Sequence, residues 1–260
     1  HEKPEGGLYY EQLFGTEGFH GVSSLLYHTH RPTMVSHIGA SKDLRPTAAV
    51  ERNIHSRMLQ GFQALPADDF LEARTAVLFN SDVQIDVAAP RKGIQDYFYK
   101  NADSDELLFI HQGSGVMRSM FGELRFEYAD YIVIPRGTIY QLTFDGPDNR
   151  VLVVESHSPV VSPKRYRNEF GQMLEHSPYC ERDFRLPTYV APIDARGEFV
   201  IKIKKQGVLH HVTYSSHPFD VVGWDGYCYP YIFSALNFEP ITGRVHQPPP
   251  VHQTFEAHNF

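Results

Sequence analysis

The stretch that decides the fold spans residues 105–159 and reads DELLFIHQGSGVMRSMFGELRFEYADYIVIPRGTIYQLTFDGPDNRVLVVESHSP. Within it, short apolar runs are separated by turns rich in glycine, proline and aspartate, and this is the pattern of consecutive β-strands. We expect the strands over residues 107–111, 115–121, 123–128, 130–134, 139–144 and 151–155.

The composition of the whole chain also favours strands. Its 260 residues include 15 Tyr and 18 Phe, which suit strands, and 19 Gly and 18 Pro, which mark turns. The tripeptide Pro135-Arg136-Gly137 lies between two expected strands and resembles the Pro-Gly turn of the second cupin motif, where a small jelly roll folds back on itself. The predicted fold class is therefore mainly β: a cupin-like, jelly-roll β-sandwich with short helices and long irregular connections.

Two regions differ from this pattern. Residues 64–74 are expected to form one or two turns of amphipathic helix. Residues 160–200 contain interspersed charges and prolines, which predict an irregular connection with short helical pieces. Because long connections in compact enzymes often line sites or subunit contacts, this connection is a candidate interface.

Charge and cysteine content narrow the class of protein. Lys and Arg total 24 against 31 Asp and Glu, a net charge of −7, so a general basic field for nucleic acid or an anionic membrane is not expected. Cys180 and Cys228 lack zinc-knuckle spacing, although a single disulfide between them stays open. The sequence has no run of eighteen apolar residues, and its start, HEKPEGGLYY, lacks the apolar core of a signal peptide. We expect a cytoplasmic protein.

The first cupin motif normally supplies metal ligands, but its counterpart in this chain does not. The matching stretch, KNADSDE at residues 100–106, contains no histidine pair. We therefore interpret Glu106 as an ordinary strand-edge charge and the cupin-like fold as a scaffold without its metal ligands.

Among the 15 histidines, two closely spaced pairs are possible metal ligands. His28 and His30 form an HxH pair that would point to one face of a strand and provide half of a metal site, but no carboxylate follows nearby. His210 and His211 would point to opposite faces of a strand, which favours plain polar surface.

The third group is the terminal stretch GRVHQPPPVHQTFEAHNF, residues 243–260. Its His252, Glu256 and His258 contain the two histidines and one carboxylate that suit ferrous iron. If residues 251–260 form one straight strand, His252 and His258 lie about 20 Å apart at roughly 3.3 Å per residue, too far for one ion. A bend would bring them together, and the alternative is a polar sheet face. The prolines before this segment fix the direction of His246, which suits a general base.

Three motifs resemble the homogentisate 1,2-dioxygenase family, specifically its bacterial forms. LYYEQLFGTEGF with SLLYHTHRP, residues 8–32, resembles the opening of the family. DELLFIHQGSG, residues 105–115, resembles its first β-sandwich, and HPFDVVGWDGYCYPYIF, residues 217–233, resembles its most specific signature. The order of the motifs also agrees, so the resemblance covers nearly the whole chain.

The resemblance implies an enzyme that uses a mononuclear Fe(II) and O2 to open the ring of homogentisate, giving maleylacetoacetate in tyrosine and phenylalanine catabolism. It places His246 as the acceptor of a proton from the substrate hydroxyl, and it places the iron ligands outside this chain. Trp224 and Tyr231 are expected to pack a domain junction. The expected partners are a small aromatic substrate and O2, and the expected assembly is a homo-oligomer, a trimer or hexamer.

On this basis residues 1–240 are expected to form an N-terminal cupin-like domain. Residues 241–260 are expected to begin a C-terminal catalytic β-sandwich that is truncated here. The chain by itself is then expected to be inactive. The alternative is a non-catalytic cupin-like module that binds or assembles with partners.

Overall fold

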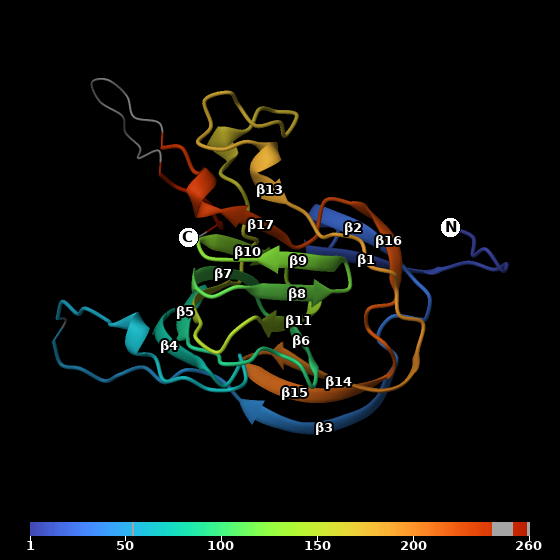
Figure 1. The fold of residues 1–260 in the computed structure, drawn as a ribbon, viewed down its shortest axis with the longest axis horizontal. Coiled ribbons are helices and arrows are strands. Elements are labelled where there is room, and N and C mark those ends of the chain that lie inside the picture. Colours follow the sequence, from blue (N-terminus) through green and yellow to red (C-terminus); the bar gives the residue numbers. More distant parts are fainter. Residues whose placement is uncertain (54, 241–251, 259–260) are drawn as a thin grey trace.

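The computed structural model describes residues 1–53, 55–240 and 252–258, and these form two large β-sheets and one small one (Figure 1). The first sheet has seven strands in the order β13 (Phe184–Arg185), β17 (Tyr231–Ser234), β10 (Asp130–Ile134), β7 (Asp105–Gln112), β12 (Arg150–Ser156), β5 (Val83–Ala88) and β4 (Arg74–Phe79). All its pairs are antiparallel.

The second sheet also has seven strands, in the order β3 (Val35–Asp43), β15 (Val208–Ser216), β14 (Arg196–Lys205), β6 (Phe98–Asn101), β11 (Ile139–Phe144), β8 (Gly115–Ser119) and β9 (Gly122–Phe126). Only its β14–β6 pair is parallel. The third sheet has the order β1 (Tyr10–Glu17), β2 (His20–His28) and β16 (Val221–Gly226).

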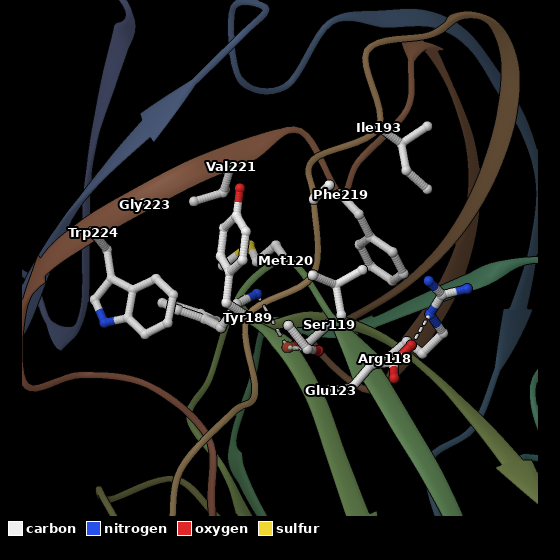
Figure 2. Close-up of a pocket in the computed structure, with 14 residues that line it drawn as sticks. Arg118, Ser119, Met120, Glu123, Tyr189, Ile193, Phe219, Val221, Gly223 and Trp224 are labelled. Atoms are coloured by element: carbon white, nitrogen blue, oxygen red, sulfur yellow. Dashed lines mark hydrogen bonds and ion pairs between the residues drawn. The ribbon is translucent and has the colours of Figure 1, made fainter.

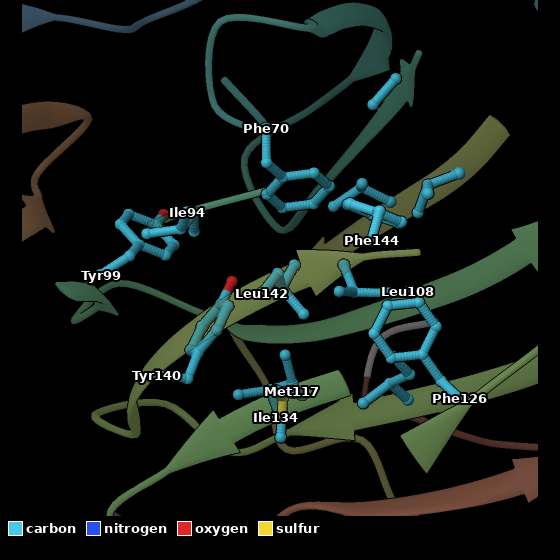
Figure 3. Close-up of a cluster of buried hydrophobic side chains, with 14 of the residues drawn as sticks. Phe70, Ile94, Tyr99, Leu108, Met117, Phe126, Ile134, Tyr140, Leu142 and Phe144 are labelled. Atoms are coloured by element: carbon cyan, nitrogen blue, oxygen red, sulfur yellow. The ribbon is translucent and has the colours of Figure 1, made fainter. Parts of the chain in front are cut away.

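The two large sheets enclose the main core. Along β7, Leu108 and Ile110 face the second sheet, while β11 contributes Tyr140, Leu142 and Phe144 from the other side (Figure 3). Side chains alternate between the two faces of a strand, so each sheet buries one complete face in this layer. The fold is a cupin-like β-sandwich, as predicted.

The second sheet buries its other face as well. Phe98 and Ile139 pack there against Phe14 and Leu26 of the three-stranded sheet. A third cluster, centred on Tyr179 and Phe233 and their neighbours, covers the outer face of the first sheet. The first sheet therefore separates the main core from this outer cluster.

The strand predictions for residues 105–159 are confirmed. Strands β10 and β11 have the predicted bounds, and the other four differ from the prediction by at most two residues at either end. The predicted helical segment at 64–74 is a single turn, in which the Ala73 N–H donates to the carbonyl oxygen of Asp69 and the Asp69 carboxylate accepts from Leu71 and Glu72 N–H.

The 160–200 connection is irregular, as predicted, and carries short 3-10 turns at Lys164–Tyr166 and Glu181–Asp183. Further 3-10 turns occur at Gly61–Gln63 and Ala235–Asn237. Strand β14 begins inside the predicted connection, at Arg196. The described helices contain none that is long and apolar enough to cross a membrane.

Candidate functional site

One end of the space between the large sheets holds a buried group of charged side chains. The Nη2 atom of Arg74 lies 2.6 Å from Glu106 Oε1, and its Nη1 atom lies 2.8 Å from Glu155 Oε1. Lys204 pairs with the other oxygen of Glu155. The Tyr140 hydroxyl donates to Glu106 Oε2 at 2.8 Å. We call Arg74, Glu106, Glu155 and Lys204 the interior ion cluster.

The interpretation of Glu106 as a strand-edge charge is wrong. Its side chain is 0% exposed and lies on the same face of β7 as Leu108 and Ile110, inside the sandwich. A carboxylate in such a place must be paired to remain charged, and Arg74 provides that pair.

The two cations of the interior ion cluster, Arg74 and Lys204, also affect the ionisation of Glu155. Burial by itself raises the pKa of this carboxyl, but Lys204 and Arg74 outweigh burial, so the pKa lies below its usual value. Asp86, on the neighbouring strand, shows the opposite balance: burial dominates and raises its pKa. A cavity of about 430 Å³ opens onto Glu155 and Lys204.

The described histidines do not fit a metal site. In the described parts of the chain, we find no group of three or more His, Cys, Asp and Glu side chains placed to hold an ion. His28 and His30 are instead bound to carboxylates: His28 Nδ1 lies 2.8 Å from Asp220 Oδ1, and His30 Nε2 lies 2.7 Å from Asp194 Oδ1. The other oxygen of Asp220 accepts the His30 N–H at 2.8 Å.

Asp220 belongs to the motif at residues 217–233, and its hydrogen bonds connect that motif to the histidine pair of the motif at residues 8–32. The HxH pair fixes how β2 leaves the small sheet, because both histidines are buried against groups that are distant in sequence. His210 and His211 lie on β15, as an extended pair would, and both are half-buried.

The terminal candidates are partly outside the described residues. His246 lies there, so its predicted role stays a prediction. Residues 252–258 do not form the strand considered from sequence; their one bridge joins Glu256 to Val161. The Glu256 carboxylate accepts the Lys164 N–H, and His258 lies 3.4 Å from Glu17. His252, Glu256 and His258 are therefore not brought together as ligands.

Residues 252–258 instead pack on the outer cluster of the first sheet. The hydroxyls of Tyr166 and Tyr179 donate to the carbonyl oxygens of Gln253 and Thr254, at 2.8 and 2.6 Å. Phe255 contacts the ring of Tyr131. The backbone of this segment is thus satisfied by the 160–200 connection rather than by a sheet.

Beside this segment lies a mostly apolar cavity of about 390 Å³, which we call the outer cavity. It is walled by β10, β17, the 160–200 connection and the end of the 217–233 motif. Its polar lining includes Asp105, Arg167 and Tyr231. Pockets of this size with a few convergent polar groups are the usual form of small-molecule sites.

Burial raises the pKa values of two groups in the wall of the outer cavity. It raises the pKa of Asp105 to about 6, although the N–H groups of Arg136 and Val160 donate to the two carboxylate oxygens and oppose the rise. It raises the pKa of the Cys228 thiol to about 12. Cys228 and Cys180 are both free thiols, so they form no disulfide.

A third, much smaller hollow lies between the small sheet and the second large sheet (Figure 2). Figure 2 shows Trp224 and Tyr189 beside it, with the Arg118–Glu123 ion pair, 2.8 Å between Nε and Oε1, at its far end. Its volume of about 20 Å³ holds little more than one water molecule. Trp224 packs edge-on against Phe121, at 5.0 Å between ring centroids, so it serves packing.

The comparisons with known proteins agree with the sequence motifs. Residues 69–235 match the family described as homogentisate 1,2-dioxygenase N-terminal. A curated protein of Saccharolobus solfataricus that carries a provisional dioxygenase name is 38% identical over 256 residues, which is 98% of this chain and 66% of that protein. The fold and these matches define a cupin-like member of a dioxygenase-like family. The chain belongs to the homogentisate 1,2-dioxygenase N-terminal family.

Two solved structures each match about a third of this chain. A cupin-2 domain protein of Shewanella frigidimarina has a TM-score of 0.27 and 15% identity, covering 32% of this chain and 78% of that one. Streptomyces PAC13 with uridine has a TM-score of 0.28 and 12% identity over 33% of this chain and 76% of that one. The description of the architecture therefore rests on the strand order given above.

Sequence reasoning missed Arg74 and Lys204. Both lie on strands that the sequence analysis did not assign, and their partners are 32 to 81 residues away. A signal was present for Glu106, because its position two residues before Leu108 places it on the inward face of the same strand.

Proposed function

We propose that the complete polypeptide is an Fe(II)-dependent dioxygenase that opens the aromatic ring of homogentisate with O2 and releases maleylacetoacetate, a step of tyrosine and phenylalanine catabolism. The observation that carries the proposal is family membership across the chain, with 98% of it matched to a dioxygenase-like relative. The chain spans 66% of that relative's length, so the activity is proposed for the complete polypeptide.

In this proposal the described residues form the scaffold. The iron, when bound, activates dioxygen, and its ligands are proposed to lie outside this chain, since His28, His30 and His258 each contact a carboxylate instead. His246 is proposed to accept the proton of a substrate hydroxyl, because neutral imidazole takes up protons near physiological pH.

We further propose a homo-oligomer, a trimer or hexamer, in the cytoplasm, with a small aromatic substrate and O2 as partners and without nucleic acid. The net charge of −7 argues against binding to nucleic acid. The irregular 160–200 connection supplies several exposed apolar side chains for assembly, among them Phe170, Leu186 and Tyr189.

Oxygen uptake by the complete polypeptide, with homogentisate and ferrous iron, tests the proposal. We expect iron-dependent uptake, and we expect His246→Gln to lower kcat by at least about 100-fold, the usual contribution of a general base, while iron content stays unchanged. Absence of iron-dependent uptake with homogentisate would overturn the substrate and the reaction together.

The second candidate is a non-catalytic cupin-like module. It is favoured by the interior ion cluster, because Arg74 and Lys204 are the cations that pair with the buried carboxylates between the sheets. An oligomer that assembles normally but shows no uptake with any hydroxylated phenylacetate would select this candidate.

A further inference from the structure

The outer cavity contains one guanidinium without a carboxylate partner. Arg167 is half-buried in the cavity wall, and its Nη2 atom donates to the Ser162 carbonyl oxygen at 3.0 Å. Among the described residues, Arg167 forms no salt bridge. The remaining N–H groups are free to bind an anion, and a planar guanidinium suits a carboxylate best.

The acidic groups of the same wall are already engaged. Asp105 accepts two backbone N–H groups, from Arg136 and Val160. Glu181 accepts the Met173 N–H at 2.6 Å. The cation is therefore the group in this cavity that most needs a charged ligand.

Tyr231 lines the outer cavity together with Arg167, and the charge of Arg167 acts on it. Burial raises the pKa of Tyr231 and nearby Tyr179 and Asp105 add to the rise, whereas the charge of Arg167 opposes it. The guanidinium and the Tyr231 hydroxyl are therefore two hydrogen-bond donors in the wall of the same cavity.

The rest of the lining is apolar. Contacts for a hydrocarbon or aromatic body come from Val22, Val133, Val160, Phe184, Leu186 and Tyr229. A volume of about 390 Å³ accommodates a ligand of a dozen or more non-hydrogen atoms, at the lower end of the usual range for such sites.

We propose that the outer cavity is a binding site for a small monocarboxylate with an apolar or aromatic body, in which Arg167 binds the carboxylate and the apolar wall holds the body. The site lies wholly on described residues of this chain. It does not depend on the ring-opening reaction proposed above.

Three probes with the same body and different head groups test the proposal: 4-phenylbutyrate, 4-phenylbutanol and 4-phenylbutylamine. Titration calorimetry with the complete polypeptide is expected to show saturable binding of the acid with a dissociation constant below about 1 mM. The alcohol and the amine are expected to bind at least about tenfold more weakly, because a charge-assisted hydrogen bond is lost.

Variants assign this binding to the cavity. Arg167→Gln is expected to weaken binding of the acid at least about tenfold and to leave binding of the alcohol unchanged. Arg182→Gln is the matched control: this arginine is on the same connection, its side chain is 87% exposed and it does not line the cavity, so binding should persist. Leu186→Trp, at the cavity wall, is expected to weaken all three probes.

Equal binding of acid and amine, an unchanged affinity in Arg167→Gln, or absence of saturable binding of the acid in the millimolar range would each overturn the proposal. Should Arg167→Gln fail to fold, the order of the three probes and their response to Leu186→Trp still decide it. Retained acid binding in a folded Leu186→Trp protein would place the ligand elsewhere.

Discussion

Replacing Lys204 tests whether the interior ion cluster holds the two large sheets together. The Lys204 and Glu155 side chains are 9% and 3% exposed, so Lys204→Met removes the ammonium without changing much volume and leaves a buried carboxylate with Arg74 alone. Breaking a buried pair in this way costs about 3–5 kcal/mol of unfolding free energy. At roughly 2–4 °C per kcal/mol for a chain of this size, Tm should fall by about 10 °C.

The pH dependence gives a second check on the same variant. The pKa of Glu155 is below its usual value in the folded protein, so it contributes stability that is present above about pH 4.5 and lost as pH falls. Without Lys204 that contribution shrinks. The difference in stability between wild type and variant should therefore be largest near pH 7 and should narrow below about pH 4.5.

Urea unfolding followed by circular dichroism measures both effects. Lys205→Met is the matched control, because Lys205 is the next residue on β14, its side chain is 57% exposed and its pair with Asp103 spans 3.8 Å. That change should cost less than about 1 kcal/mol. A loss for Lys204→Met no larger than the loss for Lys205→Met would refute the structural role of the cluster.

Three further predictions each concern a single residue. Carboxyl NMR of Asp105 should show a titration midpoint near pH 6. The contribution of this group to stability should then decline as pH rises from about 4 to 6, and a midpoint below 4 would contradict its burial. Gly93→Ala should lower the free energy of unfolding, measured by urea denaturation, by about 1–3 kcal/mol, since its Cβ would lie 1.7 Å from the Leu142 carbonyl oxygen; unchanged stability would contradict that packing. In a native thiol assay at pH 8, half-buried Cys180 should react and Cys228 should not, whereas equal rates would exclude the buried position of Cys228.

The part of the fold that could be predicted is the part marked by short apolar runs between turns. Between residues 105 and 159 each strand is such a run bounded by turn residues, so strands such as β10 and β11 follow directly. The motif at 217–233 likewise predicted the family, because its residues are close together in sequence.

The interior ion cluster could not be predicted in this way. It joins β4, β7, β12 and β14, and nothing local in β14 indicates that Lys204 rather than Lys205 points inward. The same holds for Asp220, which meets His28 across 192 positions. Long-range pairing of this kind depends on the register of the sheets, and single-sequence patterns do not contain it.

The segment 252–258 shows a different reason why local structure could not be predicted from the sequence. Its apolar and polar residues suggested an extended strand, but its backbone groups bind Val161, Tyr166 and Tyr179 of the connection instead. Competition between partners for backbone hydrogen bonds decided the local structure there, and this competition depends on the packing of the whole chain.

Our central proposal is that the described residues form a scaffold and that the complete polypeptide binds iron through residues outside this chain. Iron content after anaerobic loading with ferrous iron tests it most directly, in the wild type and in the triple variant His252→Asn/Glu256→Gln/His258→Asn. We predict one equivalent of iron in both proteins. Loss of the iron from the triple variant, with its folding intact, would contradict the claim and place the metal at the terminal segment.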